Sequence, residues 1–488
     1  MPLGNFTVQN AGITPTQDQS VLSSNYLQWN DRNGENFADF AQQYLPELYE
    51  QEVERFGNRT LSGFLRMVGA EMPMTSDQVI WSEQNRLHIG YENVSKVNTA
   101  TGATFTVNLP AGNEVVVRQN QTFVVFDPAS GLTLKGLVID PAVPNPNNPA
   151  QVTFNGACYT AINFGALGNA NLKLFVYGSD FAKGTLGMDG SVTPSFTQFS
   201  NRPIIIKDKY EVNGSDTAQI GWVEVATEDG TSGFLWYMKA ESETRLRYED
   251  YLEMAMVEGE LATTGSGVAG LTGANASAGR GTQGMFAALE ERGNVYAGFA
   301  GAANPGAGAL GDFDQILSQL DLQGAIEENM LFLDRATALD FDDMIAAQAG
   351  GGYNNTASAS YGLFDNEAEM ALNFGFSGFR RGSYDFYKTD WKYLNDATTR
   401  GMVDNIKGVL IPAGTSTVYD QMLGSNIRRP FLHVRYRASE TDDRRMKSWI
   451  TGSVGGAYTS SLDAMEVHYL SERCLCVQAA NNFVLFVA

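Results

Sequence analysis

The chain has 488 residues, of which 43% are hydrophobic, and a formal net charge of −22 at pH 7. Its length allows roughly two to four domains, and its apolar content excludes global disorder. The acidic balance argues against a sequence-specific nucleic-acid binder, because such proteins usually carry a basic patch.

Signals for secretion and for membrane insertion are missing from the sequence. The only cysteines are Cys158, Cys474 and Cys476, which form no CxxC pair and offer no disulfide framework. Residues 1–10 lack the positive and apolar regions of a signal peptide, and no run of about 18 apolar residues occurs. We therefore expect a protein of the reducing cytosol without a membrane span.

The first part of the chain is predicted to be an arm followed by helices. Residues 1–34 are polar and sparsely charged, so we expect an extended arm that becomes ordered only against a partner. Residues 36–56 have helical periodicity, with a kink or restart at Pro46, and 61–68 predict a second short helix.

From residue 78 to 232 the pattern changes to short alternating segments. Strands are expected at 105–109, 114–118, 122–126, 132–140 and 172–177, with a turn at 144–149. Their regular spacing favours a small sandwich or barrel. The dipeptide Asn213-Gly214 predicts a hairpin joining 203–212 to 219–225. A long two-stranded excursion carrying a compact β insertion is the simplest interpretation.

Residues 234–260 predict one long helix, because Gly and Pro are absent up to Gly259. The side chains expected to pack along its apolar face are Leu246, Tyr248, Tyr251, Leu252 and Met256.

A glycine-rich tract at 262–284 separates this helix from a mixed region. Short helices are expected from 283 and at 313–320, 322–329 and 336–348, around an apolar core at 330–333. The last third predicts strands at 382–393, 408–420, 430–439, 464–471 and 481–488, with a short connection at 446–450.

The sequence contains partial matches to cofactor-binding and metal-binding motifs, but the neighbouring residues do not fit any of these motifs. Residues 265–270 match GxGxxG, but a helix precedes them where the dinucleotide fingerprint needs a strand. His88, His433 and His468 are far apart and lack metal-ligand spacing. The acidic runs at 312–314 and 340–343 lack the glycine and terminal Glu of an EF-hand and suit solvated helix starts. We therefore predict no catalytic, cofactor-binding or metal site, and we expect that the protein is not an enzyme.

Two clusters have more than one interpretation. Tyr387, Trp391 and Tyr393 share one face of the strand predicted at 382–393; core or interface packing is preferred, and stacking on bases or sugars is the alternative. The one basic concentration comprises Arg428, Arg429, Arg435, Arg437, Arg444, Arg445 and Lys447. Against three acidic residues in the same stretch it carries a local charge of +4. Ion pairing with a neighbouring subunit is preferred, and nucleic-acid binding is the alternative.

The order of these elements resembles the major capsid proteins of tailed phages, which have the Hong Kong 97 fold. The segments that carry the resemblance are RLRYEDYLEMAM (245–256), VLIPAGTSTVYD (409–420) and RRPFLHVRYRASETDDRRMKSWITG (428–452), and they are similar to those of crAss-like phages. The resemblance implies an α+β fold in which an N-terminal arm and helix at 1–60 come first. An extended E-loop follows at 61–233 and carries an inserted β domain at about 97–180. The spine helix of a peripheral domain is implied at 234–265, an axial domain at 266–370, and a peripheral β region with the C-terminal strand at 371–488.

The resemblance also implies a function. It implies a structural subunit that self-assembles into hexamers and pentamers of an icosahedral head around double-stranded DNA, which it meets by non-specific proximity. Portal, auxiliary or head-fibre proteins are the other implied partners, with assembly in the host bacterial cytoplasm, no cofactor and no membrane. The alternatives are a β-rich carbohydrate-binding or adhesive protein, or another virion component such as a tail or portal protein.

Overall fold

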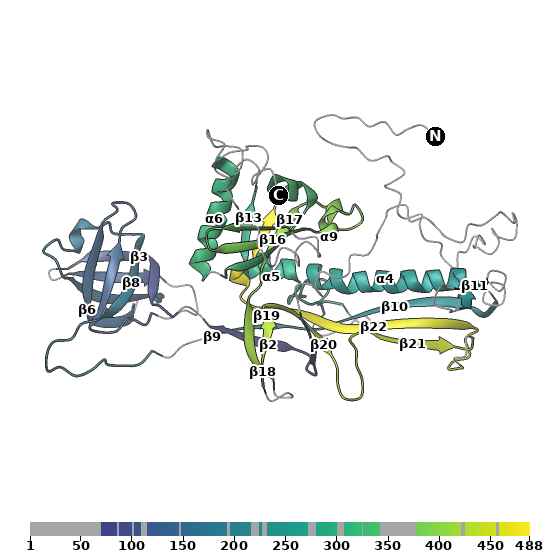
Figure 1. Cartoon of the computed structure of the whole chain (residues 1–488). Helices are drawn as coiled ribbons and strands as arrows, with labels where there is room; N and C mark the ends of the chain where they lie inside the picture. Colours follow the sequence, from purple (N-terminus) through teal and green to yellow (C-terminus); the bar gives the residue numbers. More distant parts are fainter. Residues whose placement is uncertain are drawn as a thin grey trace. The chain divides into compact units, whose positions relative to one another are not determined.

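The computed structural model describes residues 70–84, 87–99, 102–108, 115–145, 148–192, 196–215, 224–226, 232–271, 280–299, 307–324, 326–341, 377–420, 425–454 and 458–488. The predicted arm and the helices at 36–56 and 61–68 lie outside these residues. Within them the fold is mixed α+β and dominated by strands, which confirms the predicted class. The chain divides into two compact units, a barrel unit at Trp81–Phe199 and a sheet unit made of Met1–Ile80 and Ser200–Ala488 (Figure 1).

The barrel unit is a closed barrel with the strand order β3-β4-β7-β6-β5-β8. Its strands are β3 (Gly90–Asn98), β4 (Ala103–Asn108), β5 (Gln121–Phe126), β6 (Thr133–Asn145), β7 (Asn148–Cys158) and β8 (Leu172–Ser179), and a 3-10 turn lies at Phe164–Ala166. All neighbouring strands are antiparallel. Of the two folds that the sequence favours, the barrel is therefore the one observed.

Four phenylalanine rings fill the centre of the barrel. Phe105, Phe123, Phe154 and Phe164 are buried, with ring centroids 5.1–5.8 Å apart. Gly156 lies against them, and a Cβ there would sit 2.6 Å from the Phe123 ring. The interior is thus a packed core, as in other small barrels whose side chains fill the inside.

Two predictions in the barrel unit need correction. The turn expected at 144–149 is shorter than predicted, since β6 continues to Asn145, β7 begins at Asn148, and the two strands pair across register shifts; residues 146–147 between them lie outside the described part of the chain. Such irregular pairing tolerates the prolines that made the segment resemble a turn. The strand expected at 114–118 is absent at 115–118, although Val117 packs into the barrel core.

A two-stranded ribbon leads into and out of the barrel. It pairs β2 (Val79–Gln84) with β9 (Phe196–Asn201), and the rings of Trp81 and Phe199 lie 6.3 Å apart.

The first sheet of the sheet unit is built around one long strand. β22 (Ala464–Val477) pairs with β20 (Leu432–Arg437), β10 (Ile204–Asn213) and β21 (Lys447–Gly452), and β1 (Ala70–Met74) pairs parallel to β20. The connection predicted at 446–450 is therefore wrong, because β21 completes the edge of this sheet. The hairpin predicted at Asn213-Gly214 leads into residues 216–223, which lie outside the described part of the chain.

The predicted long helix is α4 (Leu235–Glu258), which lies along β10 and β22 (Figure 1). Tyr248 stacks on Tyr469 with centroids 5.6 Å apart, and its hydroxyl donates to the Ile206 carbonyl at 3.1 Å. Leu252 and Met256 are also buried, whereas Leu246 and Tyr251 are 41% and 45% exposed.

The prediction that Leu246 and Tyr251 pack is thus wrong within the single chain. At about 100° per residue, Leu246 lies about 160° around the helix from Tyr248, on the opposite side.

The second sheet of the same unit is mixed, with the order β13-β23-β17-β14-β16-β15. Its strands are β13 (Asn294–Ala297), β14 (Glu328–Leu333), β15 (Ser377–Arg381), β16 (Tyr384–Asp390), β17 (Ile406–Pro412) and β23 (Val484–Val487). The helices of this part are α5 (Met285–Arg292), α6 (Ala307–Gln323), a segment at 335–341 and α9 (Lys392–Asn395), with 3-10 turns at Arg400–Met402 and Ala480–Asn482.

The helix predicted at 322–329 is wrong. α6 ends at Gln323 and Glu328 begins β14, a strand with neighbours on both sides, because tertiary pairing overrides local helix propensity there.

One apolar core is shared between the two sheets of this unit. It receives Met256 from α4, Leu289 from α5, Val409 from β17, Leu475 from β22 and Leu485 from β23. Two short ribbons complete the described elements: β11 (Glu224–Ala226) with β12 (Ser232–Phe234), and β18 (Thr415–Asp420) with β19 (Ser425–Pro430).

Candidate functional site

Among the residues that the structure describes, the largest group of interacting charges lies where β1, β20 and β22 meet the 438–446 connection. We call it the charge cluster; its members are Glu71, Asp77, Arg437, Asp442, Arg444, Arg445, Lys447, Glu472 and Arg473. It contains four of the seven basic residues singled out from the sequence. The contacts of the charge cluster therefore show what these four basic residues do within the chain.

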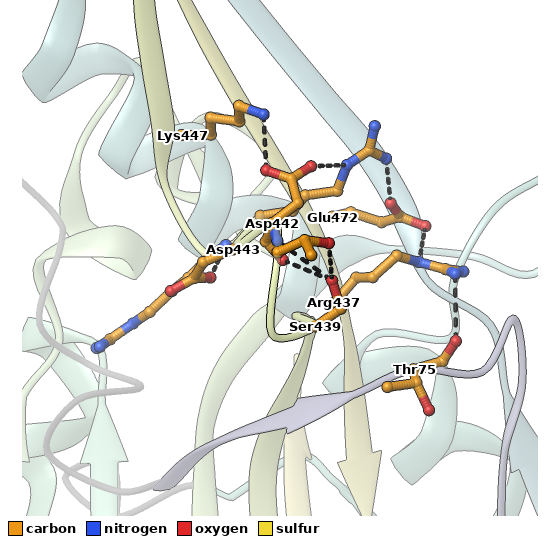
Figure 2. Close-up of polar contacts among 10 residues, drawn as sticks. Thr75, Arg437, Ser439, Asp442, Asp443, Lys447 and Glu472 are labelled. Atoms are coloured by element: carbon orange, nitrogen blue, oxygen red, sulfur yellow. Dashed lines mark hydrogen bonds and ion pairs between the residues drawn. The ribbon is translucent and has the colours of Figure 1, made fainter.

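Glu472 is the centre of the charge cluster. Its carboxylate is buried and pairs with Arg437 Nε at 2.7 Å and Arg444 Nη1 at 2.6 Å (Figure 2). Arg437 also pairs with Asp77 and contacts the Thr75 carbonyl, both just beyond β1. Two guanidinium groups thus compensate one carboxylate that has little water around it, as buried charges require.

A second carboxylate, Glu71 on β1, pairs with Arg445 and with Arg473. Arg473 donates from Nη2 to the Arg445 carbonyl at 2.7 Å and from Nε to Ser471 Oγ at 2.9 Å. Among the described strands β1 pairs with β20 alone, so the two ion pairs of Glu71 add side-chain contacts to the backbone hydrogen bonds that hold this edge strand.

The turn between β20 and β21 is organised by Asp442. Its carboxylate accepts a hydrogen bond from Lys447 Nζ at 2.6 Å and pairs with Arg444 at 3.5 Å (Figure 2). The hydrogen bond from Lys447 is the main reason that the pKa of Asp442 lies below its usual range. Ser439 Oγ accepts from the Asp442 backbone N–H at 3.2 Å, which closes the turn.

The charge cluster is an internal ion network that is close to neutral. Its five basic residues face four acidic ones, so the positive charge that motivated the nucleic-acid alternative is largely compensated within the chain. An intersubunit role for these residues stays a prediction. Arg435 lies on β20 opposite Cys474, and Arg428 and Arg429 lie on β19.

Sequence reasoning missed three of the four acidic members of the network, Glu71, Asp77 and Glu472. Glu71 and Asp77 lie about 360 positions from Arg437 in the chain, and no local pattern connects segments so far apart. A signal was present at Glu472 and Arg473, two charges inside the mostly apolar run YLSERCLCV of β22. Charged residues at buried strand positions need partners and so mark a network.

The remaining candidate residues lie in separate places. His88 is exposed, His433 is buried with Nδ1 3.2 Å from the Pro430 carbonyl, and His468 stacks on Trp449 with centroids 5.2 Å apart. Cys474 and Cys476 are buried on β22, and a hydrogen bond from Cys474 lowers the pKa of Cys476. Among the residues that the structure describes, no three or more His, Cys, Asp or Glu side chains are grouped to hold a metal ion.

The aromatic residues expected on one strand face do not share a strand. β16 ends at Asp390, Trp391 is the residue before α9, and Tyr393 lies inside it. Trp391 and Tyr393 are buried in the shared core, and Tyr387 packs against it. Core packing is thus the correct interpretation for these three residues, and the expected strand face is wrong.

The GxGxxG match and the acidic runs also have structural roles. Residues 265–270 form turns after α4, and Gly265 has a φ of +88°, which favours glycine. Asp314 accepts two hydrogen bonds from Arg381, at 2.9 and 2.7 Å. Asp342 and Asp343 lie outside the described residues. In the described part of the chain, no helix is long and apolar enough to cross a membrane.

Comparisons with known proteins give structural matches only. No family model and no curated protein matches the chain. A solved structure from Gordonia phage Cozz matches with a TM-score of 0.39 and 8% identity over 95% of this chain and 98% of that one. The asymmetric unit of the bacteriophage PhiM1 mature capsid matches with a TM-score of 0.37 and 9% identity over 91% of each chain. A chain from Mycobacterium phage Bobi matches with a TM-score of 0.35 and 8% identity over 90% and 95%.

Proposed function

We propose that the chain is the major capsid subunit of a tailed phage, with the Hong Kong 97-like organisation that its sequence resembles. In this proposal it assembles into hexamers and pentamers of an icosahedral head around double-stranded DNA. It acts as a structural protein of the virion, without catalysis and without a cofactor.

The observation that carries the proposal is the position of α4. The helix lies on β10 and β22, and it follows the two-stranded excursion and β10 to β12 in the chain and precedes the region that builds the mixed sheet. The chain then returns to the first sheet through β20–β22 and ends in the mixed sheet at β23. This order supports a peripheral domain with a spine helix joined to an axial domain.

Exposed apolar side chains on α4 also support an assembly role. Leu246 and Tyr251 are large, and both are exposed in the single chain. A surface helix usually turns such residues inward, so their exposure favours burial against another subunit. Modest contacts of this kind, repeated around each subunit, add up by multivalency to a durable shell.

The direct test is to express the full chain and to image it by negative-stain electron microscopy. Closed shells, partial shells or six-membered rings support the proposal. A monodisperse monomer at micromolar concentration and physiological salt contradicts it and returns the tail, portal and adhesive alternatives to first place.

A second experiment asks which surfaces join the subunits. Deletion of residues 1–34 should leave the circular dichroism spectrum unchanged and block assembly, if the arm reaches a neighbouring subunit. Charge reversal of Arg428 and Arg429 should likewise reduce assembly. Reversal of Lys173, which pairs with Glu92 on the barrel at 3.0 Å, is the matched control and should leave assembly unchanged.

A further inference from the structure

The outer face of β8 carries two aromatic rings that the barrel does not use. Strand alternation turns Leu172 and Leu174 into the core and leaves Phe175 and Tyr177 52% and 51% exposed. Large aromatic side chains are normally buried on folding, because each contributes substantially when it leaves water. Two adjacent exposed rings on one rigid strand therefore require an explanation.

Backbone pairing places a buried valine and a lysine on the strands next to these rings. Val124 on β5 pairs with Phe175, and Lys135 on β6 pairs with Val124. Lys135 Nζ lies 5.9 Å from the centre of the Tyr177 ring, a cation–π distance. Tyr159, which follows β7, donates its backbone N–H to the Lys135 carbonyl at 3.1 Å.

Polar groups lie beside the rings. Tyr159 is 49% exposed, and its hydroxyl donates to Asp180 Oδ2 at 2.9 Å. We call the set the aromatic platform; its members are Val124, Lys135, Tyr159, Phe175, Tyr177 and Asp180. The platform thus combines apolar ring faces with a hydroxyl, a carboxylate and an ammonium group, all on strands or directly after them.

The platform is open on the β3 side. Gly90 pairs with Phe175, and a Cβ at this position would meet no atom closer than 3.7 Å. A second glycine, Gly178, follows Tyr177 directly. Gly90 begins β3 and Gly178 is next to last in β8, so neither adds a side chain that could cover the rings.

The net charge of the barrel unit argues against a nucleic acid as the ligand of the aromatic platform. The barrel unit contains six Lys or Arg and seven Asp or Glu residues, a net charge of −1, whereas the whole chain carries −22. A nucleic acid would require a positive surface to compensate its phosphates. A sugar ring is uncharged and has an apolar C–H face and hydroxyl edges, which match aromatic rings flanked by hydrogen-bonding groups.

We propose that the aromatic platform binds neutral polysaccharide. Sugar rings stack on Phe175 and Tyr177, while Tyr159, Asp180 and Lys135 form hydrogen bonds with their hydroxyl groups. This activity belongs to the barrel unit and does not depend on the proposed capsid role.

Biolayer interferometry on the full chain tests the proposal, with biotinylated dextran, mannan and xylan as the immobilised probes. We expect the wild-type chain to bind at least one of the three. Phe175→Ala and Tyr177→Ala should each weaken that binding by about tenfold, the loss typical of removing one stacking partner. Both side chains are exposed, so the core rings stay in place, and near-UV circular dichroism checks this for each variant.

The matched control is Phe196→Ala, which removes a 60% exposed ring from β9 of the same unit and should change affinity by less than about twofold. Absence of binding to all three polysaccharides overturns the proposal, as does equal binding by wild type and Tyr177→Ala. If Tyr177→Ala instead changes the oligomeric state in analytical ultracentrifugation while no polysaccharide binds, the platform is a protein contact and the proposal is wrong.

Discussion

Within the charge cluster, Glu472 and Asp77 share a partner but differ in their surroundings. Both pair with Arg437, yet the side chain of Glu472 is 7% exposed and that of Asp77 is 93% exposed. Water screens the outer pair, and side-chain entropy opposes it, so exposed ion pairs usually contribute little. The inner carboxylate compensates two guanidinium groups where water is scarce, and its loss leaves both without that partner.

Glu472→Gln should therefore lower the free energy of unfolding by about 2–4 kcal/mol, whereas Asp77→Asn should leave it within measurement error. Urea denaturation followed by tryptophan fluorescence measures both. Equal effects of the two substitutions would show that burial does not govern this network.

Buried tyrosines should make the stability of the fold depend on pH in the alkaline range. The Tyr393 hydroxyl donates to Glu258 at 2.5 Å and the Tyr248 hydroxyl donates to Ile206 at 3.1 Å. Burial is the main cause that raises the pKa of both phenols, and it raises the pKa of Tyr210 to about 12.

Above pH 10 the unfolded chain loses these protons while the folded chain keeps them, so stability should fall as the pH rises from about 10 through 12. Below pH 10 both states are protonated and the contribution is fully present. Denaturation midpoints between pH 8 and pH 12 measure this slope. Tyr393→Phe should reduce it, and Tyr458→Phe, at a tyrosine that is 86% exposed, should not. A slope that does not respond to Tyr393→Phe would exclude this phenol as the cause.

At the scale of elements, α4 shows what periodicity can and cannot predict. The absence of Gly and Pro predicted a helix that the structure places at Leu235–Glu258, within a few residues of the expected bounds. The width of its buried face was overestimated, because spacing alone does not reveal which neighbouring strands the helix meets. Tyr469 and Ile206, the contacts that decide this, come from strands far away in the sequence.

Substitutions on the buried side and on the exposed side of α4 should differ in their effect on stability. Leu252→Ala should destabilise the sheet unit by about 2–4 kcal/mol, because its side chain is buried and its removal leaves a cavity. Leu246→Ala changes the same residue type on the same helix, but at an exposed position, and should cost less than about 1 kcal/mol. Thermal denaturation of the unassembled chain measures both. A larger effect at Leu246 would contradict the burial described above.

Strands were predicted correctly where apolar and polar residues alternate along the sequence. They were missed where a segment is a strand only because it pairs with a distant strand. β5 and β8 were expected from apolar alternation between turn residues, and both are present. β14 and β21 were not expected, since their sequences also suit a helix or a loop. Each is a strand because it pairs along its length with a distant one, β14 with β16 and β17, and β21 with β22. Glu71 and Asp77 of the charge cluster were missed for the same reason, because their partners are also far away in the sequence.

For the whole molecule, the division into two units has a thermodynamic consequence. The barrel core draws on residues between Tyr91 and Val176, and the apolar clusters described in the sheet unit contain no residue of the barrel unit. A domain with its own core can fold alone. The paired strands β2 and β9 connect the barrel to the rest of the chain through one ribbon.

We therefore expect the fragment 81–199 to fold by itself with one cooperative thermal transition. In the complementary chain, a four-residue Gly-Ser linker replaces 85–195, and we expect it to keep the transition of the sheet unit. Differential scanning calorimetry of the full chain and of both pieces measures this. The control is the fragment 81–158, which lacks β8 and so leaves β3 and β5 without the strand that closes the barrel; it should show no transition. If 81–199 also lacks a transition, the barrel depends on the sheet unit and the two units fold as one.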